Sequence, residues 1–275
     1  MPIVNAQDIS GEAAQICAED AALGYATWRL DLAYEGTAYR GWARQPGQRT
    51  IEGLVMEVLE TVLREPVRLS VAGRTDAGVH AWAQVASFVC ARRDLRPERL
   101  IFSLNALLPP DIAVTAVSAA PGFTARRAAS RTYQYRLLTA TAKPVRERAY
   151  VWNVRGALDP SLLAEAASLL PGKRDFAALT PSARLYHSCV REVLTADWLP
   201  TAGGEASTGP ADWTFTITAG SFLHNMVRVA VGSMVDVAQG RMTLAGLAEG
   251  LASGERRRMG QTAPARGLAL VAVAY

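Results

Sequence analysis

Alternating apolar and polar residues in the first half of the chain predict strands, and one stretch with helical spacing separates the first two. Residues 28–34 alternate in this way, which indicates a half-buried strand. Residues 51–63 place apolar side chains three and four positions apart, which predicts a helix with Thr50 as its N-cap. The same patterns predict strand, strand, helix and strand at residues 67–72, 79–89, 97–107 and 112–117. The resulting order, β-α-β-β-α-β, is that of a ferredoxin-like fold.

The second half of the chain repeats this order with looser spacing. Its predicted strands lie at residues 133–137, 190–198, 213–219 and 268–273, and its predicted helices at residues 162–170, 222–237 and 244–251. Residues 200–211 are rich in Gly, Ser, Thr and Pro, which predicts a surface loop. We therefore expect an α+β protein made of two ferredoxin-like halves, whose antiparallel sheets meet around a central active-site cleft.

The predicted domain organisation has three parts. Residues 1–25 form an acidic N-terminal extension, residues 26–122 form the first α/β half, and residues 123–275 form the second. The extension is set apart by its charge, because residues 1–24 hold four acidic side chains and no Lys or Arg. The whole chain has a net charge of +4, and all its basic residues except Lys143 and Lys173 are arginines. This balance fits RNA binding and equally fits the codon bias of a GC-rich genome.

Cysteine and histidine are too few and too scattered to indicate a disulfide framework or a metal site. The three cysteines lie far apart in the sequence, which fits a reducing cytoplasm, and the three histidines show no metal-ligand spacing. The sequence has no apolar run long enough to span a membrane, no secretory signal and no phosphate-binding glycine loop. We expect a cytoplasmic protein without metal or cofactor.

The most informative segment, at residues 73–81, reads Gly-Arg-Thr-Asp-Ala-Gly-Val-His-Ala. It joins two predicted strands and places Asp76 in a turn bounded by Gly73 and Gly78, with Arg74 nearby. Glycine lets the backbone bend where a Cβ atom would obstruct it. A carboxylate fixed beside a guanidinium suits a nucleophile or a base. Taken alone, the spacing more often describes an aspartate that only stabilises the turn.

Six segments resemble the tRNA pseudouridine synthase A family over residues 26–275, and along the chain they follow one another in the family's order. They are GRTDAGVHA at residues 73–81, YEGTAYRGW at 34–42, NALLPPDIAV at 105–114, FTAR with RTYQY at 123–135, FLHNMVR at 222–228 and APARGL at 263–268. The resemblance implies an isomerase that converts uridine to pseudouridine in tRNA. It also implies that Asp76 is the catalytic aspartate. Whether this carboxylate attacks C1′ or takes the 2′ proton stays open.

The resemblance also assigns roles to residues that handle the substrate. Arg228 corresponds to the arginine of the MVR segment, and its positive charge would keep a half-buried carboxylate ionised. Tyr133 would stack on the extruded uracil, although a core position beside Tyr135 is the alternative. Arg74 would help to flip or replace the target base. The expected contacts with the RNA backbone are Arg126 and Arg131.

The expected partners follow from the same resemblance. The substrate would be the anticodon stem-loop of tRNA, with uridines at positions 38–40, and the protein would be a homodimer. Around Trp42, a basic and aromatic loop with Arg40, Arg44 and Gln45 would touch RNA or pack between subunits. We interpret His80 and His224 as structural rather than acid-base residues. Two further hypotheses are an RNA-binding protein of this fold that has lost catalysis and an unrelated hydrolase, which would need a second carboxylate near Asp76.

Overall fold

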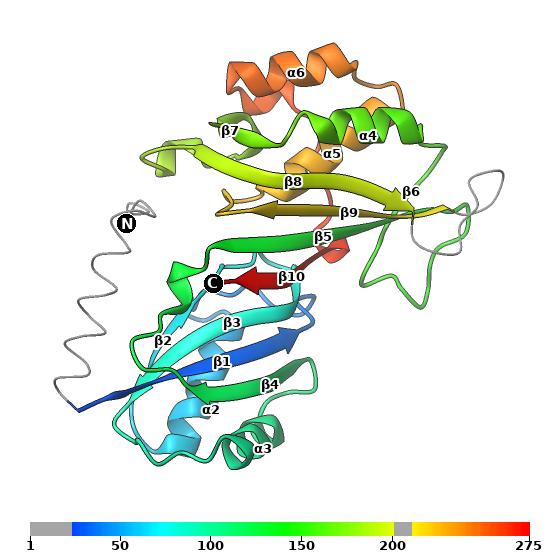
Figure 1. The fold of residues 1–275 in the computed structure, drawn as a ribbon. Helices are drawn as coiled ribbons and strands as arrows, with labels where there is room; N and C mark the ends of the chain where they lie inside the picture. The colour runs from blue at the N-terminus through cyan, green and yellow to red at the C-terminus, as the bar shows by residue number, and fades with distance from the viewer. Residues whose placement is uncertain (1–23, 201–210) are drawn as a thin grey trace. The chain divides into compact units, whose positions relative to one another are not determined.

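The structure, a computed structural model, describes residues 24–200 and 211–275. Most of the predicted acidic extension, the cysteine at position 17 and most of the predicted loop at residues 200–211 lie outside the described residues. The described residues form two compact units, one from residues 24–129 with 270–275 and the other from residues 130–269. Both units are mixed α/β structures, and the described residues hold five α-helices (Figure 1).

The N-terminal unit has the element order predicted from its pattern. Its elements are β1 (Ala26–Tyr34), α2 (Ile51–Leu63), β2 (Arg68–Val71), β3 (His80–Cys90), α3 (Pro97–Leu107) and β4 (Ile112–Ala119). The sheet runs β4-β1-β3, with β2 also paired to β3 and with β10 (Leu268–Ala274) beside β3. The strand β1 pairs antiparallel with both β3 and β4. Its side chains Leu30 and Leu32 are fully buried, and they form the core of the unit.

Local chemistry explains where the two helices of this unit begin. The Thr50 side chain accepts a hydrogen bond from the Gly53 N–H, so it caps α2 as predicted. Pro97 begins α3, where its missing N–H costs nothing. The helix α2 ends at Arg64, which adopts a left-handed conformation with φ 58°.

The second unit carries more elements than its pattern predicted. They are β5 (Ser130–Thr139), β6 (Trp152–Val154), α4 (Pro160–Ser168), β7 (Gly172–Asp175), β8 (Val190–Pro200), β9 (Ala211–Ala219), α5 (Met226–Ala238) and α6 (Leu244–Ser253). The strands run β5-β9-β8-β7, with β6 parallel to β5. The helices α4, α5 and α6 lie together on one side of these strands (Figure 1). The additional strands β6 and β7 are short, and the prediction missed both.

The helix predicted at residues 222–237 begins later than expected. The structure begins α5 at Met226 because Asn225 before it adopts a left-handed conformation with φ 61°. Before the helix, the Met226 N–H donates to the Leu223 carbonyl oxygen at 3.1 Å, so residues 223–226 form a separate turn. Among the described residues no helix has the length and apolar character that crossing a membrane requires.

Candidate active site

Asp76 lies in the turn between β2 and β3, as predicted. The turn closes through a hydrogen bond of 3.1 Å from the Val79 N–H to the Asp76 carbonyl oxygen. Gly78 has φ 78°, a conformation that favours glycine. Along the turn Arg74 is exposed, Thr75 is buried and Asp76 is half-buried. The Asp76 carboxylate is therefore partly shielded from solvent, on a turn whose backbone is constrained.

A second segment, residues 36–42, holds this turn in place. The Trp42 N–H donates to the Thr75 carbonyl oxygen at 3.0 Å, and the Gly78 N–H donates to the Tyr39 carbonyl oxygen at 3.3 Å. At Gly41, with φ 91°, an added Cβ would lie 2.8 Å from the Thr75 carbonyl oxygen. The two backbones thus approach so closely that a side chain at residue 41 would push the turn away. This contact explains why glycine precedes Trp42 in the YEGTAYRGW segment.

A buried network of side chains anchors the residue directly before Asp76. The hydroxyl groups of Tyr34 and Thr75 share a hydrogen bond of 2.8 Å. The side-chain amide of Gln84 donates to the Tyr34 hydroxyl at 3.1 Å and to the Gly73 carbonyl oxygen at 2.8 Å. Burial raises the pKa of Tyr34 to about 12, so its hydroxyl stays protonated at neutral pH. These hydrogen bonds therefore fix Gly73 and Thr75, which lie on either side of Arg74, just before Asp76.

His80, at the end of the turn, is a structural residue in the geometry of this unit. It is 1% exposed, and its Nδ1 atom accepts a hydrogen bond of 3.1 Å from the Gly36 N–H. A Cβ atom at Gly36 would lie 1.9 Å from the Val79 carbonyl oxygen, so residue 36 must be glycine for this contact to form. These contacts agree with the interpretation of His80 as hydrogen-bonded rather than catalytic.

Trp42 corrects one expectation. Its side chain is fully buried, and the ring lies 6.0 Å from that of Tyr34. It therefore packs in the core of the unit and is not available to contact RNA or a second subunit. The neighbouring Arg40, Arg44 and Gln45 are exposed.

Arg126 is carried by a short 3-10 helix, Ala125–Arg127, that packs against the start of the turn that holds Asp76. The Ala125 N–H donates to the Ser87 hydroxyl oxygen at 3.1 Å. Ala125 shares a small apolar cluster with Ala72, the residue before Gly73. Arg126 is exposed, as is Arg74. The N-terminal unit therefore brings Asp76, Arg74 and Arg126 onto adjoining segments.

Tyr133 and Arg131 belong to the other unit and lie on one face of β5. Both are buried, at 7% and 8% exposed. The Tyr133 ring meets the ring of Phe222 edge-on at 5.0 Å between centroids. The Arg131 Nη1 atom donates to the Gly220 carbonyl oxygen at 2.6 Å. This contact favours a role for Arg131 in holding the turn before Phe222 over a direct phosphate contact.

Tyr135, two residues further along β5, is the structural member of the tyrosine pair. It is fully buried, and its hydroxyl donates to the Pro264 carbonyl oxygen at 2.8 Å. A Cβ atom at Gly267 would lie 2.6 Å from its ring. The APARGL segment therefore packs against Tyr135, and the close approach of the ring accounts for the glycine at position 267.

Arg228 projects from the first turn of α5 and is partly buried. Its Nε atom donates to the Ala263 carbonyl oxygen at 2.8 Å, and its Nη1 atom donates to the Asn225 Oδ1 atom at 2.7 Å. The Ala263 N–H donates in return to the Arg228 carbonyl oxygen at 3.0 Å. The guanidinium is thus held in one orientation by the FLHNMVR and APARGL segments together.

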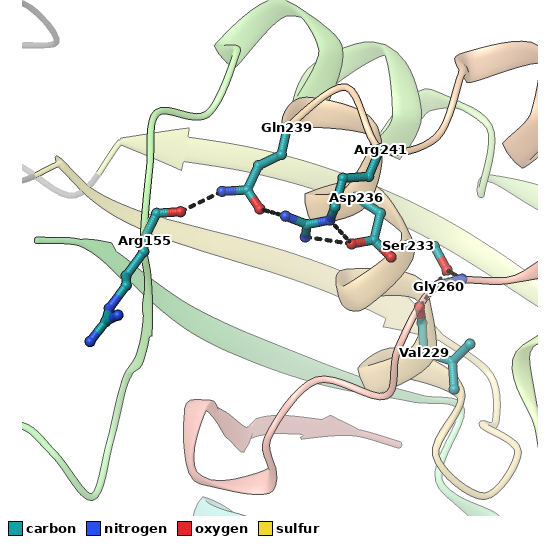
Figure 2. A network of polar contacts seen from close by, with 7 residues as sticks. All are labelled: Arg155, Val229, Ser233, Asp236, Gln239, Arg241 and Gly260. Atoms are coloured by element: carbon teal, nitrogen blue, oxygen red, sulfur yellow. Dashed lines mark hydrogen bonds and ion pairs between the residues drawn. The ribbon is translucent and has the colours of Figure 1, made fainter.

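The rest of α5 fixes the segment that contacts Arg228 (Figure 2). The Ser233 hydroxyl donates to the Val229 carbonyl oxygen and accepts from the Gly260 N–H, at 2.8 and 2.9 Å. Beyond Ser233, the end of α5 is tied by a chain of polar contacts in the order Asp236, Arg241, Gln239 and the Arg155 carbonyl oxygen. Both ends of α5 are therefore constrained.

The described residues contain no group of three His, Cys, Asp or Glu side chains that could hold a metal ion.

His224, the other histidine considered above, is exposed and shares a hydrogen bond of 2.9 Å with the Ser182 hydroxyl. The sequence prediction missed Gln84, Thr75 and Tyr34. Tyr34 and Thr75 lie inside the YEGTAYRGW and GRTDAGVHA segments, whereas the only signal for Gln84 was a polar residue among the apolar positions of β3.

Comparison with known proteins identifies the class to which this fold and site belong. A family model described as tRNA pseudouridine synthase matches residues 32–126 and 166–275. A tRNA pseudouridine synthase A from Solidesulfovibrio magneticus is 41% identical over 258 residues, which is 90% of each chain. Proteins of the same name from Geobacter sulfurreducens and Myxococcus xanthus are 38% and 39% identical over 90% of this chain, and over 99% and 91% of their own. The chain belongs to the tRNA pseudouridine synthase family.

Proposed function

We propose that this protein isomerises uridine to pseudouridine in the anticodon stem-loop of tRNA, with Asp76 as nucleophile or base. The observation that carries the proposal is the Asp76 turn itself. It is half-buried, closed by its own hydrogen bond and held by the backbone of residues 39–42. A reacting group fixed in this way approaches its target without first losing conformational freedom. The curated relatives named above are called tRNA pseudouridine synthase A, which supports uridine isomerisation in tRNA, and they cover nine-tenths of the chain.

The reaction exchanges one glycosidic bond for another. The bond between C1′ and N1 of the uridine breaks, the uracil turns, and C1′ forms a bond to C5. The proton displaced from C5 is lost and N1 gains one, so no atom or electron is added overall. A carboxylate can attack C1′ directly or take the 2′ proton to start this sequence. Asp76 suits either step, and no oxidant, nucleotide or metal enters the balance.

The other site residues have proposed roles in handling the base. A uridine in a stem-loop must leave the stack before it reacts. Tyr133 would stack on the extruded uracil, and Arg74 would take part in flipping or replacing it. Arg228 would stabilise the carboxylate form of Asp76 and Arg126 would contact the RNA backbone. For Arg131 we propose a positioning role through Gly220, on the strength of their hydrogen bond.

The proposal extends to architecture, assembly and location. We propose that the two units are two ferredoxin-like halves, the second with inserted strands, and that the protein acts as a cytoplasmic homodimer. The order of elements in the N-terminal unit supports the first of these statements. Mass photometry of the purified protein with and without tRNA would test the second, and a monomer that is fully active at its assay concentration would contradict it.

The direct test of the catalytic role is the variant Asp76→Asn with an unmodified tRNA transcript under single-turnover conditions. The amide keeps the shape of the side chain but cannot act as nucleophile or base, so we expect the rate to fall by about a thousandfold or more. The affinity for tRNA should change little. Asp94→Asn is the matched control, because Asp94 is exposed in the same unit. Substantial turnover by verified Asp76→Asn protein would remove Asp76 from the catalytic role.

The same assay decides on the second candidate, an RNA-binding protein that has lost catalysis. That hypothesis predicts tRNA binding by the unaltered protein without any pseudouridine product. The intact set of Asp76, Arg74, Tyr133 and Arg228 favours the enzyme.

A further inference from the structure

One tryptophan of the N-terminal unit is exposed although its environment is highly ordered. All six tryptophans lie in the described part of the chain. Trp82 is 45% exposed, whereas none of the other five exceeds 9%. A large aromatic side chain left in water costs free energy that burial would recover. Trp82 directly follows the GRTDAGVHA segment that carries Asp76, and this position suggests a use for its exposure.

An irregularity of the sheet turns Trp82 outward. In the pairing of β1 with β3, Leu32 faces Gln84 and Tyr34 faces Ala81. The strand β1 therefore advances two residues while β3 advances three, so Trp82 and Ala83 together face Ala33. Such a bulge breaks the alternation of faces and redirects a side chain, and bulges are frequent beside active sites. The bulge keeps Gln84 and Ala81 on the buried face while Trp82 reaches solvent.

The exposed ring is also held in one orientation. The rings of His80 and Trp82 stack at 5.4 Å between centroids with 15° between their planes. His80 is itself locked by the hydrogen bond from the Gly36 N–H. Val79, its neighbour, donates to the carbonyl oxygen of Asp76. The indole therefore stacks on His80, and the neighbouring Val79 is hydrogen-bonded to Asp76. These contacts leave the indole little conformational freedom to lose on binding.

Charge near Trp82 does not oppose an anionic ligand. Asp31 lies on the face of β1 that Ala33 also occupies, and its carboxylate is paired with Arg29 at 2.9 Å. Arg74 is exposed on the catalytic turn. The N-terminal unit therefore presents an exposed aromatic ring on β3 and an exposed cation on the turn that precedes this strand, and the Asp31 carboxylate is paired. Aromatic platforms beside basic groups are the general means by which proteins bind unpaired nucleobases.

We propose that Trp82 is a stacking platform for an unpaired base of the RNA substrate and so helps to position the target uridine at Asp76. The proposal rests on the function proposed above and adds a substrate-positioning residue to that site. It assigns the contact to the π-face of a nucleobase rather than to phosphate. It therefore predicts an effect on substrate binding that depends on the presence of an aromatic ring at position 82.

The kinetic test compares Trp82→Ala with Trp82→Phe on an unmodified tRNA transcript. We expect Trp82→Ala to raise KM and the tRNA Kd about tenfold or more, while the single-turnover rate at saturation falls much less. Trp82→Phe should retain most of the affinity because a ring remains. Phe102→Ala is the matched control, since Phe102 is a 77% exposed aromatic residue on α3 of the same unit. Unchanged KM and Kd in Trp82→Ala would overturn the proposal. It would also be overturned if Trp82→Phe lost as much affinity as Trp82→Ala and its thermal midpoint fell as well, because the effect would then be one on folding.

Fluorescence supplies a readout that a merely structural role would not move. Because the other tryptophans are buried, the emission that acrylamide quenches should come from Trp82 and be absent from Trp82→Phe. We expect saturating tRNA to protect this emission, and full quenching of the tRNA complex would contradict the stacking contact. Failure of the proposed function gives a different result, namely no pseudouridine from the unaltered protein. Even then, the quenching experiment would test this proposal, because tRNA that stacks on Trp82 protects its emission from acrylamide.

Discussion

At the scale of single residues, the site depends on close backbone approaches that only glycine permits. Gly41 is the clearest case, since it combines a φ of 91° with the contact between residue 41 and the Thr75 carbonyl oxygen. Gly47 lies in the same loop region and also has a positive φ, of 68°, but an added Cβ there would meet nothing within 4 Å. Alanine substitutions at Gly41 and Gly47 therefore separate the cost of the backbone conformation from the cost of displacing the Asp76 turn.

We predict that Gly41→Ala loses activity out of proportion to its stability. Gly47→Ala should lower the free energy of unfolding by about 1–2 kcal/mol, because alanine disfavours a positive φ, and Gly41→Ala should lower it further because its Cβ also meets the Thr75 carbonyl oxygen. Only Gly41→Ala should displace Asp76, and a small misplacement of a reacting group costs about a hundredfold in rate. Denaturant unfolding and single-turnover rates would check this. Equal rates in the two variants would show that the contact with the turn is unimportant for catalysis.

We predict that Tyr133→Ala impairs isomerisation far more than Tyr133→Phe. The ring is what stacking requires, so Phe should retain most activity, whereas Ala should lose about ten- to hundredfold. Single-turnover rates and thermal midpoints of both variants would decide. If the hydroxyl takes part in proton transfer, the two variants will be similarly inactive. If both stay active and only unfold at lower temperature, the contact with Phe222 is the role of Tyr133.

At the scale of elements, the sequence predicted what local chemistry determines. The cap at Thr50, the start of α3 at Pro97 and the turn between β2 and β3 each follow from neighbouring residues. The late start of α5 did not follow, because nothing local shows that Asn225 adopts a left-handed conformation. The strand β7 was missed because its four residues are all exposed and show no alternation.

The packing of α5 against residues 260–263 yields an element-scale prediction. A Cβ atom at Gly232 would lie 1.8 Å from the Gln261 carbonyl oxygen, so Gly232→Ala must separate the helix from this segment. We expect about 3 kcal/mol or more of destabilisation and a loss of activity, because Ala263 orients Arg228. Gly246→Ala in α6 is the control, since its nearest contact is a hydroxyl at 3.1 Å and alanine favours a helix by about 1 kcal/mol. Unfolding curves that coincide for the two variants would contradict this packing.

At the scale of the whole molecule, the segments that identified the family converge within each unit. In the N-terminal unit, YEGTAYRGW holds the turn of Asp76, and Tyr39 donates to Asp111 of the NALLPPDIAV segment at 2.5 Å. In the other unit, RTYQY, FLHNMVR and APARGL meet at Tyr135, Arg228 and Ala263. The sequence predicted the site residues through resemblance. It could not predict these contacts, nor the bulge at Trp82, because they join residues far apart in the chain.

The central claim is that this protein makes pseudouridine in tRNA through Asp76, and mapping of the modified bases tests it most directly. Pseudouridine would be mapped in tRNA from cells that lack the gene, and from the same cells supplied with the unaltered protein or with Asp76→Asn. We predict that pseudouridine in the anticodon stem-loop disappears on deletion and returns with the unaltered protein but not with Asp76→Asn. An unchanged modification pattern after deletion, or full restoration by Asp76→Asn, would contradict the account.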